Sequence, residues 1–154
     1  MSRRSWVQSP VWSLFCTLTA VWGVALATFW GCCRLGELTV LNLSSIDPTF
    51  NVTCSPGPIL RTLTDRTHSV DVHVPWTKTT KECGADVVLT ACSDDLCPCV
   101  AILNHFLVNN NIPPDQLLFS YKLPHDCYHP LTKQDFIKVA QLSYYQCINT
   151  DQSQ

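Results

Sequence analysis

The sequence predicts a small disulfide-rich α+β domain in which N-terminal strands are followed by two main helices, behind an N-terminal leader. Two patterns predict this class. Residues 69–75 alternate apolar and polar positions with a period of two, which is typical of a half-buried strand, and residues 132–147 repeat apolar positions at helical spacing. The ten cysteines in 154 residues indicate that disulfides reinforce the domain in an oxidising compartment.

The beginning of the chain has the features of a secretory leader. Two arginines precede an uncharged, mainly apolar run over residues 11–30, and Ala25 and Ala27 supply the small residues of a cleavage site. We expect cleavage after Ala27, which gives a signal peptide of residues 1–27 and a single domain of residues 28–154. The alternative is an uncleaved signal anchor, since roughly 20 weakly apolar residues can just span a bilayer.

The charge and the remaining apolar segments limit the possible partners. The chain has 10 basic and 12 acidic residues and contains no basic run, so we do not expect it to bind nucleic acid. No second apolar run approaches the length of a membrane span, and a cleaved product is therefore expected to have no anchor of its own.

Three strands are predicted in the first part of the domain. Residues 37–43 are expected to form a strand that ends before the turn at Asp47-Pro48. The segment 54–58 is expected to be a loop because it contains two prolines and a glycine. Residues 85–91 form a short apolar run that fits a more buried strand. Residues 69–75 should point three valines inward: Val70, Val72 and Val74.

The first main helix is predicted between the cap at Ser93 and the breaker cluster 109–114. Pro98 is tolerable in this helix only within the first turn. Pro114-Asp115 is expected to start a short helical turn, and residues 121–130 are expected to be a loop. The apolar face of the helix is expected to consist of the residues that recur at helical spacing: Leu96, Cys99, Val100, Leu103, Phe106 and Leu107.

The second main helix has the clearest start signal in the chain. Thr132 is expected to cap it, and Asp135 lies three residues further on, as in a capping box. Leu131 and Phe136 stand at the two positions of a hydrophobic staple. One face of this helix then carries Phe136, Val139, Ala140, Ser143, Tyr144 and Cys147.

Nine cysteines remain once Cys16 is removed with the leader, and we expect them to form a disulfide framework. Adjacent cysteines rarely bond each other, so Cys32 and Cys33 should each reach a separate, distant partner. The odd number indicates either a bond to another chain or one free thiol. The framework consists of Cys32, Cys33, Cys54, Cys83, Cys92, Cys97, Cys99, Cys127 and Cys147.

Two sequons, Asn42-Leu43-Ser44 and Asn51-Val52-Thr53, predict N-glycosylation at Asn42 and Asn51 if the chain enters the secretory pathway. Both sequons flank the predicted turn at Asp47-Pro48, so this edge of the domain is expected to face solvent.

Two local clusters invite other interpretations. A zinc site could be proposed around Cys92, Cys97 and Cys99, with Cys83 and His105 nearby, but their spacing is not that of a zinc ribbon or finger. If Cys97 and Cys99 are both helical, they point about 200° apart.

A nucleophile could be proposed at Cys127, between His125 and His129, but catalytic groups usually converge from separate elements, whereas these share one loop. We therefore expect no metal, no cofactor and no enzymatic activity.

The order of these features resembles glycoprotein L of herpesviruses, most of all the short form of gammaherpesviruses. The resemblance begins with a cleaved leader followed at once by Cys32-Cys33. It continues through a leucine-rich segment with sequons, and then through a cysteine-terminated run that leads into an apolar helix over residues 96–107. The matching segments are Leu41-Asn42-Leu43-Ser44, Asn51-Val52-Thr53-Cys54 and Val87-Val88-Leu89-Thr90-Ala91-Cys92.

This resemblance implies a non-enzymatic virion envelope subunit that reaches the host cell surface through the secretory pathway. Such a protein binds membrane-anchored glycoprotein H as a heterodimer, possibly covalent, and assists its folding and transport. The pair regulates the membrane fusion driven by glycoprotein B and often contacts a host receptor. The expected contact surface is residues 28–54 together with the helix 94–109.

The resemblance also implies that Cys32 and Cys33 pair with Cys54 and Cys92. The five other framework cysteines would then form two more bonds and leave one odd thiol: Cys83, Cys97, Cys99, Cys127 and Cys147.

A secreted chemokine-like ligand is the alternative, because an N-terminal Cys-Cys pair followed by strands and a C-terminal helix is also the layout of chemokines. Acidic charge and nine cysteines disfavour it. The 28 residues that separate Cys54 from Cys83 are also more than chemokines usually have in that loop.

Overall fold

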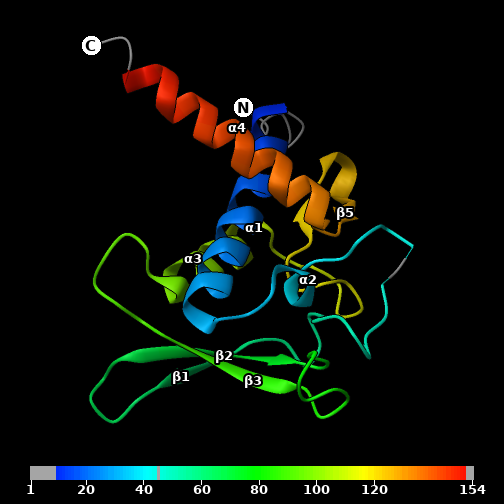
Figure 1. Ribbon diagram of the computed structural model, residues 1–154, viewed down its shortest axis with the longest axis vertical. Coiled ribbons are helices and arrows are strands. Elements are labelled where there is room, and N and C mark those ends of the chain that lie inside the picture. The colour runs from blue at the N-terminus through cyan, green and yellow to red at the C-terminus, as the bar shows by residue number, and fades with distance from the viewer. Residues whose placement is uncertain (1–9, 45, 152–154) are drawn as a thin grey trace, which may run out of the picture.

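The computed structural model describes residues 10–44 and 46–151, except for the side chains of residues 10, 126 and 144–151. At one end of the molecule lies a three-stranded antiparallel sheet in the order β1 (Ile59–Thr62), β2 (His68–Val74) and β3 (Ala85–Thr90) (Figure 1). Two helices, α1 (Pro10–Gly31) and α3 (Pro98–Val108), pack together over this sheet (Figure 1). The predicted α+β class is confirmed, although the longest helix, α1, precedes the strands.

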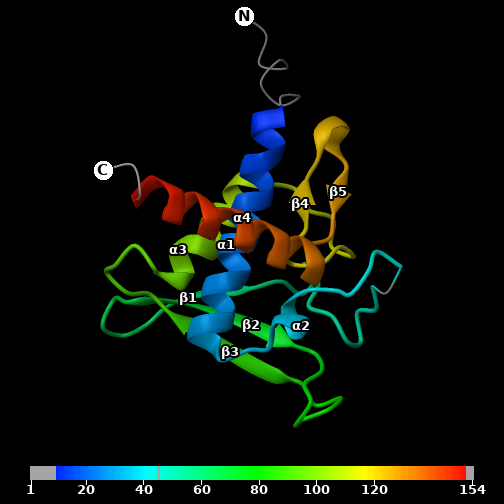
Figure 2. The same cartoon turned by 45° about the horizontal axis from the view of Figure 1, so that its top comes forward.

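The last helix, α4 (Lys133–Asp151), crosses α1 on the side away from the sheet (Figure 2). A small hairpin of β4 (Tyr121–Lys122) and β5 (Tyr128–His129) lies near the start of α4, with a 3₁₀ turn, η1 (Pro124–Asp126), between its strands. The prediction of a loop over residues 121–130 was therefore wrong, since strands β4 and β5 lie within it. Strands of two residues are too short to show a period in the sequence.

The strand predicted at residues 69–75 is confirmed as β2. Its alternation buries Val70, Val72 and Val74, while His73 between them is exposed. The strand predicted at residues 85–91 is confirmed as β3, which pairs antiparallel with β2 from Val74↔Ala85 to Ser69↔Thr90. The prediction that it is the more buried strand was wrong, because β3 is an edge strand and buries only Leu89.

The tight turn before β3 requires Gly84. This residue has a φ of +62°, and a Cβ at this position would lie 2.4 Å from the carbonyl oxygen of Val74.

The prediction of a strand at residues 37–43 was wrong. The chain forms a one-turn helix there, α2 (Leu35–Leu38), and only Val40 makes an isolated parallel bridge, to Thr132. The Glu37 carboxylate accepts a hydrogen bond of 2.8 Å from the backbone N–H of Arg34, which stabilises the helical turn. This local capping overrode the alternating pattern on which the prediction rested.

The first strand of the sheet lies instead at β1, which the sequence did not reveal. All four β1 residues are exposed, because β1 is an edge strand that pairs only with β2. A strand that buries no side chain has no apolar alternation to detect. An ion pair between Arg61 and Asp71 joins β1 to β2 on the exposed side.

The helix predicted to end at the breaker cluster 109–114 is confirmed as α3, which ends at Val108. Its start was predicted too early, since the cap is Cys97 rather than Ser93, and Pro98 occupies the first helical turn. Pro114-Asp115 forms a turn and no helix.

The face of α3 that was predicted to be buried is largely exposed. Cys99 is buried and Phe106 is half-buried, but the four leucine and valine positions of that face lie on the surface: Leu96, Val100, Leu103 and Leu107. Besides Cys99, the residues of α3 that are buried in the core include Ala101, Ile102 and His105, which lie outside the predicted face. This helix is apolar on most sides, so periodicity alone did not decide which side faces inward.

The start of α4 follows the prediction. The Thr132 hydroxyl accepts a hydrogen bond of 3.0 Å from the Asp135 N–H and donates one of 2.7 Å to the Asp135 carboxylate. Leu131 is fully buried, and Phe136 packs against the same core, as the staple predicts.

Thr132→Ala is expected to lower the free energy of unfolding by about 1 kcal/mol, because it removes the acceptor for a backbone N–H in the first turn of α4. Thr132→Ser is the matched control, since it keeps the hydroxyl. Denaturant midpoints measure the difference, and equal losses for the two variants would contradict the capping role.

Candidate docking surface and cysteine framework

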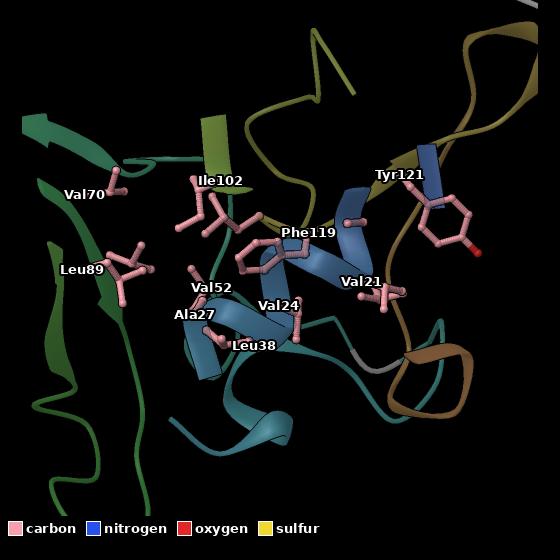
Figure 3. Close-up of a cluster of buried hydrophobic side chains, with 14 of the residues drawn as sticks. Val21, Val24, Ala27, Leu38, Val52, Val70, Leu89, Ile102, Phe119 and Tyr121 are labelled. Carbon is pink, nitrogen blue, oxygen red and sulfur yellow. The ribbon is translucent and has the colours of Figure 1, made fainter. Parts of the chain in front are cut away.

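Helix α1 forms one side of the hydrophobic core. One side of it packs against α3, β3 and the segment around β4 (Figure 3). The buried positions recur at helical spacing and are mostly small: Cys16, Ala20, Val21, Gly23, Val24, Leu26 and Ala27. A leader-like segment therefore occupies a place in this structure that core residues normally occupy.

The surface covered by α1 is here called the leader-helix groove, and it consists of Leu89, His105, Asn109, Phe119 and Tyr121. Phe119 lies against the middle of α1, where a Cβ added to Gly23 would come within 3.0 Å of its ring. Tyr121 lies beside Val21 at one end of the groove (Figure 3). Leu89 lies at the other end, 3.3 Å from a Cβ placed on Gly31.

A buried polar network joins the groove to α1. The Asn109 side-chain amide donates hydrogen bonds to the Cys16 carbonyl oxygen at 3.0 Å and to the Thr19 hydroxyl at 3.1 Å. The Asn109 amide oxygen accepts from the Lys122 N–H at 2.8 Å. One side chain at the end of α3 thus links α1 to β4.

His105 extends this network into the core. Its Nε2 lies 2.9 Å from the Leu118 carbonyl oxygen, and its Nδ1 lies 3.1 Å from the Asn109 amide nitrogen. A neutral imidazole with the proton on Nε2 satisfies both contacts. Burial lowers the pKa of His105 to about 4, although the hydrogen bond to Leu118 raises it in part.

The outward side of α1 is also apolar. It exposes Val11, Leu14, Phe15, Leu18 and Trp22, and α1 carries no charged residue. In the described part of the chain, α1 alone is long and apolar enough to cross a membrane. A signal sequence and a buried core helix meet the same criterion, and α1 has features of both.

The adjacent cysteines follow directly after α1. Cys32 is exposed and has a φ of +53°, and Cys33 is half-buried beside the end of α1. Burial raises the pKa of the Cys33 thiol to about 11, and the negative charge of Glu37 acts in the same direction. A thiol with such a pKa is protonated at neutral pH.

Cys54 lies far from this pair in the sequence and near the residues that precede β4. Its backbone N–H donates to Gln116, and its thiol donates to the carbonyl oxygen of Leu117 at 3.6 Å. Burial raises the pKa of this thiol to about 11.

Cys92, Cys97 and Cys99 form a cluster between the end of β3 and the start of α3. The Cys97 sulfur accepts a hydrogen bond of 3.4 Å from the Cys92 N–H, and the Cys99 thiol donates to the Leu89 carbonyl oxygen at 3.1 Å. Burial acts to raise the pKa of Cys97, but backbone hydrogen bonds from Val100, Cys92 and Cys99 lower it overall. Cys97 is the N-cap of α3 and not a helical residue, so the angle of about 200° expected between helical Cys97 and Cys99 side chains does not apply.

Cys83 and Cys127 are exposed, and the Cys147 side chain lies outside the described residues. The nine cysteines whose side chains are described, Cys16 among them, carry free thiols, and the predicted disulfides stay predictions. The Cys127 thiol approaches the His125 carbonyl oxygen at 3.8 Å. Among the described residues, no three His, Cys, Asp or Glu side chains are grouped so that they could hold a metal ion.

The first sequon lies on the surface, whereas the second is partly buried, with Val52 in the core. Asn42 is exposed, and its amide oxygen accepts hydrogen bonds from Ser44. Asn51 is half-buried and borders a surface hollow of about 740 Å³ beside α2, where Lys81 stacks over the Trp76 ring. A glycan on Asn51 would partly cover this hollow.

Sequence reasoning missed the two polar residues that matter most to the groove. His105 was considered only as a metal ligand, and Asn109 only as a helix breaker. Their i, i+4 spacing places them on one face of α3, and this spacing was the signal available in the sequence.

Comparisons with protein-family models, with curated proteins and with solved structures find no match to this chain. The structure itself defines the class: a small mixed α+β domain whose core is completed by an N-terminal apolar helix.

Proposed function

We propose that this chain is a non-enzymatic subunit of a viral envelope complex, similar to glycoprotein L of gammaherpesviruses. In this role it enters the secretory pathway, binds membrane-anchored glycoprotein H and assists its folding and transport. The heterodimer then regulates the membrane fusion driven by glycoprotein B and takes part in entry into the host cell.

One observation carries the proposal: the core is built in part from the predicted leader. Cleavage after Ala27 would remove the α1 residues that cover Phe119, His105 and Asn109. A small domain depends on a complete core for its stability. The cleaved chain would therefore need another protein to cover the exposed surface, as a dependent subunit does.

The outward side of α1 supports its role as a leader. A helix that rests permanently on the surface of a soluble domain usually carries charged residues on its outer side. The outer side of α1 carries Phe15, Leu18 and Trp22 instead. Such a helix is suited to the apolar environment of a translocon or a bilayer.

A second exposed surface supports a partner. Val100, Leu103 and Leu107 form an exposed apolar stripe along α3, with Leu96 just before the helix, within the contact surface expected from the sequence. Monomeric soluble proteins rarely expose contiguous apolar stripes of this kind.

Co-expression tests the proposal. We expect the full chain, expressed alone in human cells, to be secreted poorly, and we expect the ectodomain of a gammaherpesvirus glycoprotein H to raise its secretion at least about tenfold, since partner binding stabilises the folded state. An unrelated envelope ectodomain is the control. Efficient secretion of a stable monomer, unchanged by co-expression, would exclude the dependent-subunit role.

A chemokine-like ligand remains the second candidate because of one specific observation. In the sequence, the Cys32-Cys33 pair is followed by the three-stranded antiparallel sheet and then by a helix. Calcium flux in receptor-bearing cells exposed to the purified chain would favour this candidate. The α3 helix here leads into β4, β5 and α4 rather than ending the domain.

A further inference from the structure

We propose that removal of the leader opens the leader-helix groove, and that an apolar α-helix of the partner envelope protein takes the place of α1 in it. The inference rests on the proposed function for the identity of the partner. It adds the site of contact and the kind of segment that fits this site.

The shape of the groove requires a helix with small residues on one side. Cys16, Ala20, Gly23 and Ala27 follow one another at intervals of three or four residues, so they lie on one face of α1. Gly23 meets the Phe119 ring, and a Cβ there would already stand at 3.0 Å from it. A replacement helix therefore needs glycine or another small residue opposite Phe119.

The polar groups of the groove also require an occupant. Without one, the Asn109 amide N–H groups lose the Cys16 carbonyl and the Thr19 hydroxyl as acceptors. One amide N–H keeps His105 Nδ1 as its acceptor, and the other needs an acceptor from an occupant to avoid an unfavourable unpaired donor. The Thr19 hydroxyl itself donates to the Cys16 carbonyl at 3.0 Å. A partner helix with a serine or threonine at the matching position would present the same pair of acceptors.

The exposed outer side of α1 favours its replacement. Phe15, Leu18 and Trp22 are left in contact with water, whereas the outer side of a partner helix would be covered by the rest of the partner.

After cleavage, the residues that remain cover only one end of the groove. Trp30 donates a hydrogen bond of 2.9 Å from its indole N–H to the Leu96 carbonyl oxygen, and Gly31 packs against Val87 and Leu89. These contacts hold the new N-terminus beside the start of α3. They leave the part of the groove around Phe119 and Asn109 uncovered.

Photo-crosslinking in the assembled complex tests the inference. Tyr121 is replaced by the photoreactive p-benzoyl-phenylalanine in the full chain, which is co-expressed with the glycoprotein H ectodomain, and the crosslinked peptides are identified by mass spectrometry. We expect a crosslink from position 121 to an apolar helical segment of the partner, in a chain that begins at Thr28. The same replacement at Thr80, in an exposed loop, is expected not to reach that segment.

The outcomes separate the inference from the proposed function. A complex that co-purifies but crosslinks at position 121 only to residues 10–27 of its own leader, or to no partner segment, would overturn the inference alone. A chain that forms no complex with the partner would overturn both.

A pair of matched substitutions gives a second readout. Asn109→Asp replaces the donor that faces the Cys16 carbonyl with a carboxylate oxygen, while the oxygen that faces Lys122 is kept. Asn110→Asp introduces the same charge at the adjacent, exposed position. We expect Asn109→Asp to reduce the yield of complex at least about tenfold and Asn110→Asp to leave it nearly unchanged. Equal yields for the two variants would contradict the proposed role of the groove.

Discussion

Phe119→Ala is expected to lower the free energy of unfolding of the chain by about 4 kcal/mol. Phe119 is 1 % exposed and lies between α1 and α3, with its ring centroid 5.4 Å from that of His105 (Figure 3). Truncation would leave a cavity that the facing helices cannot close, because Gly23 has no side chain with which to fill it. Denaturant unfolding of the purified full-length chain, with residues 1–27 retained, measures the loss.

Phe50→Ala is the matched control for this prediction. Phe50 is 50 % exposed and contacts the Trp76 ring at a centroid distance of 6.0 Å. Its removal is expected to cost no more than about 1.5 kcal/mol, the value of a partly exposed aromatic pair. A loss at Phe119 no larger than the loss at Phe50 would mean that Phe119 does not hold α1 and α3 together.

Acidification is expected to destabilise the fold through His105. Burial holds the pKa of His105 at about 4 in the folded chain, below its ordinary value of 6.5. Between these two values the unfolded state binds more protons than the folded state, so stability falls as the pH decreases from 6.5 to 4. The full loss over this window is about 3 kcal/mol, since each pKa unit corresponds to about 1.4 kcal/mol.

Denaturant unfolding at pH 7 and at pH 4.5 measures this effect in the full-length wild-type chain, with residues 1–27 retained, and in the same chain with His105→Gln. The variant is expected to be less stable at pH 7 but to lose most of the pH dependence between these values. His68→Gln, which changes an exposed histidine, is expected to keep it. An unchanged pH dependence in His105→Gln would show that another group is responsible.

Local signals in the sequence predicted the elements that local chemistry determines. The alternation of Val70, Val72 and Val74 located β2, and Thr132 with Asp135 located the start of α4. The same reasoning failed for residues 37–43, where the Glu37 carboxylate caps a helical turn and outweighs a weak strand pattern.

Features that depend on tertiary contacts could not be predicted in this way. The inward face of α3 is set by α1 on one side and the sheet on the other, so an apolar helix with two possible faces was assigned the wrong one. The buried roles of His105 and Asn109 exist only because α1 and the Leu118 carbonyl supply their hydrogen-bond partners. The cysteine pairing depends on the same long-range geometry and stays a prediction.

The intact mass of the chain in a secreted complex with the glycoprotein H ectodomain tests the central claim most directly. After enzymatic removal of N-glycans, the account predicts the mass of residues 28–154, which means that α1 is absent and the partner covers the groove. A mass that includes residues 1–27 would show that α1 remains a permanent part of the core, and this result would contradict the account.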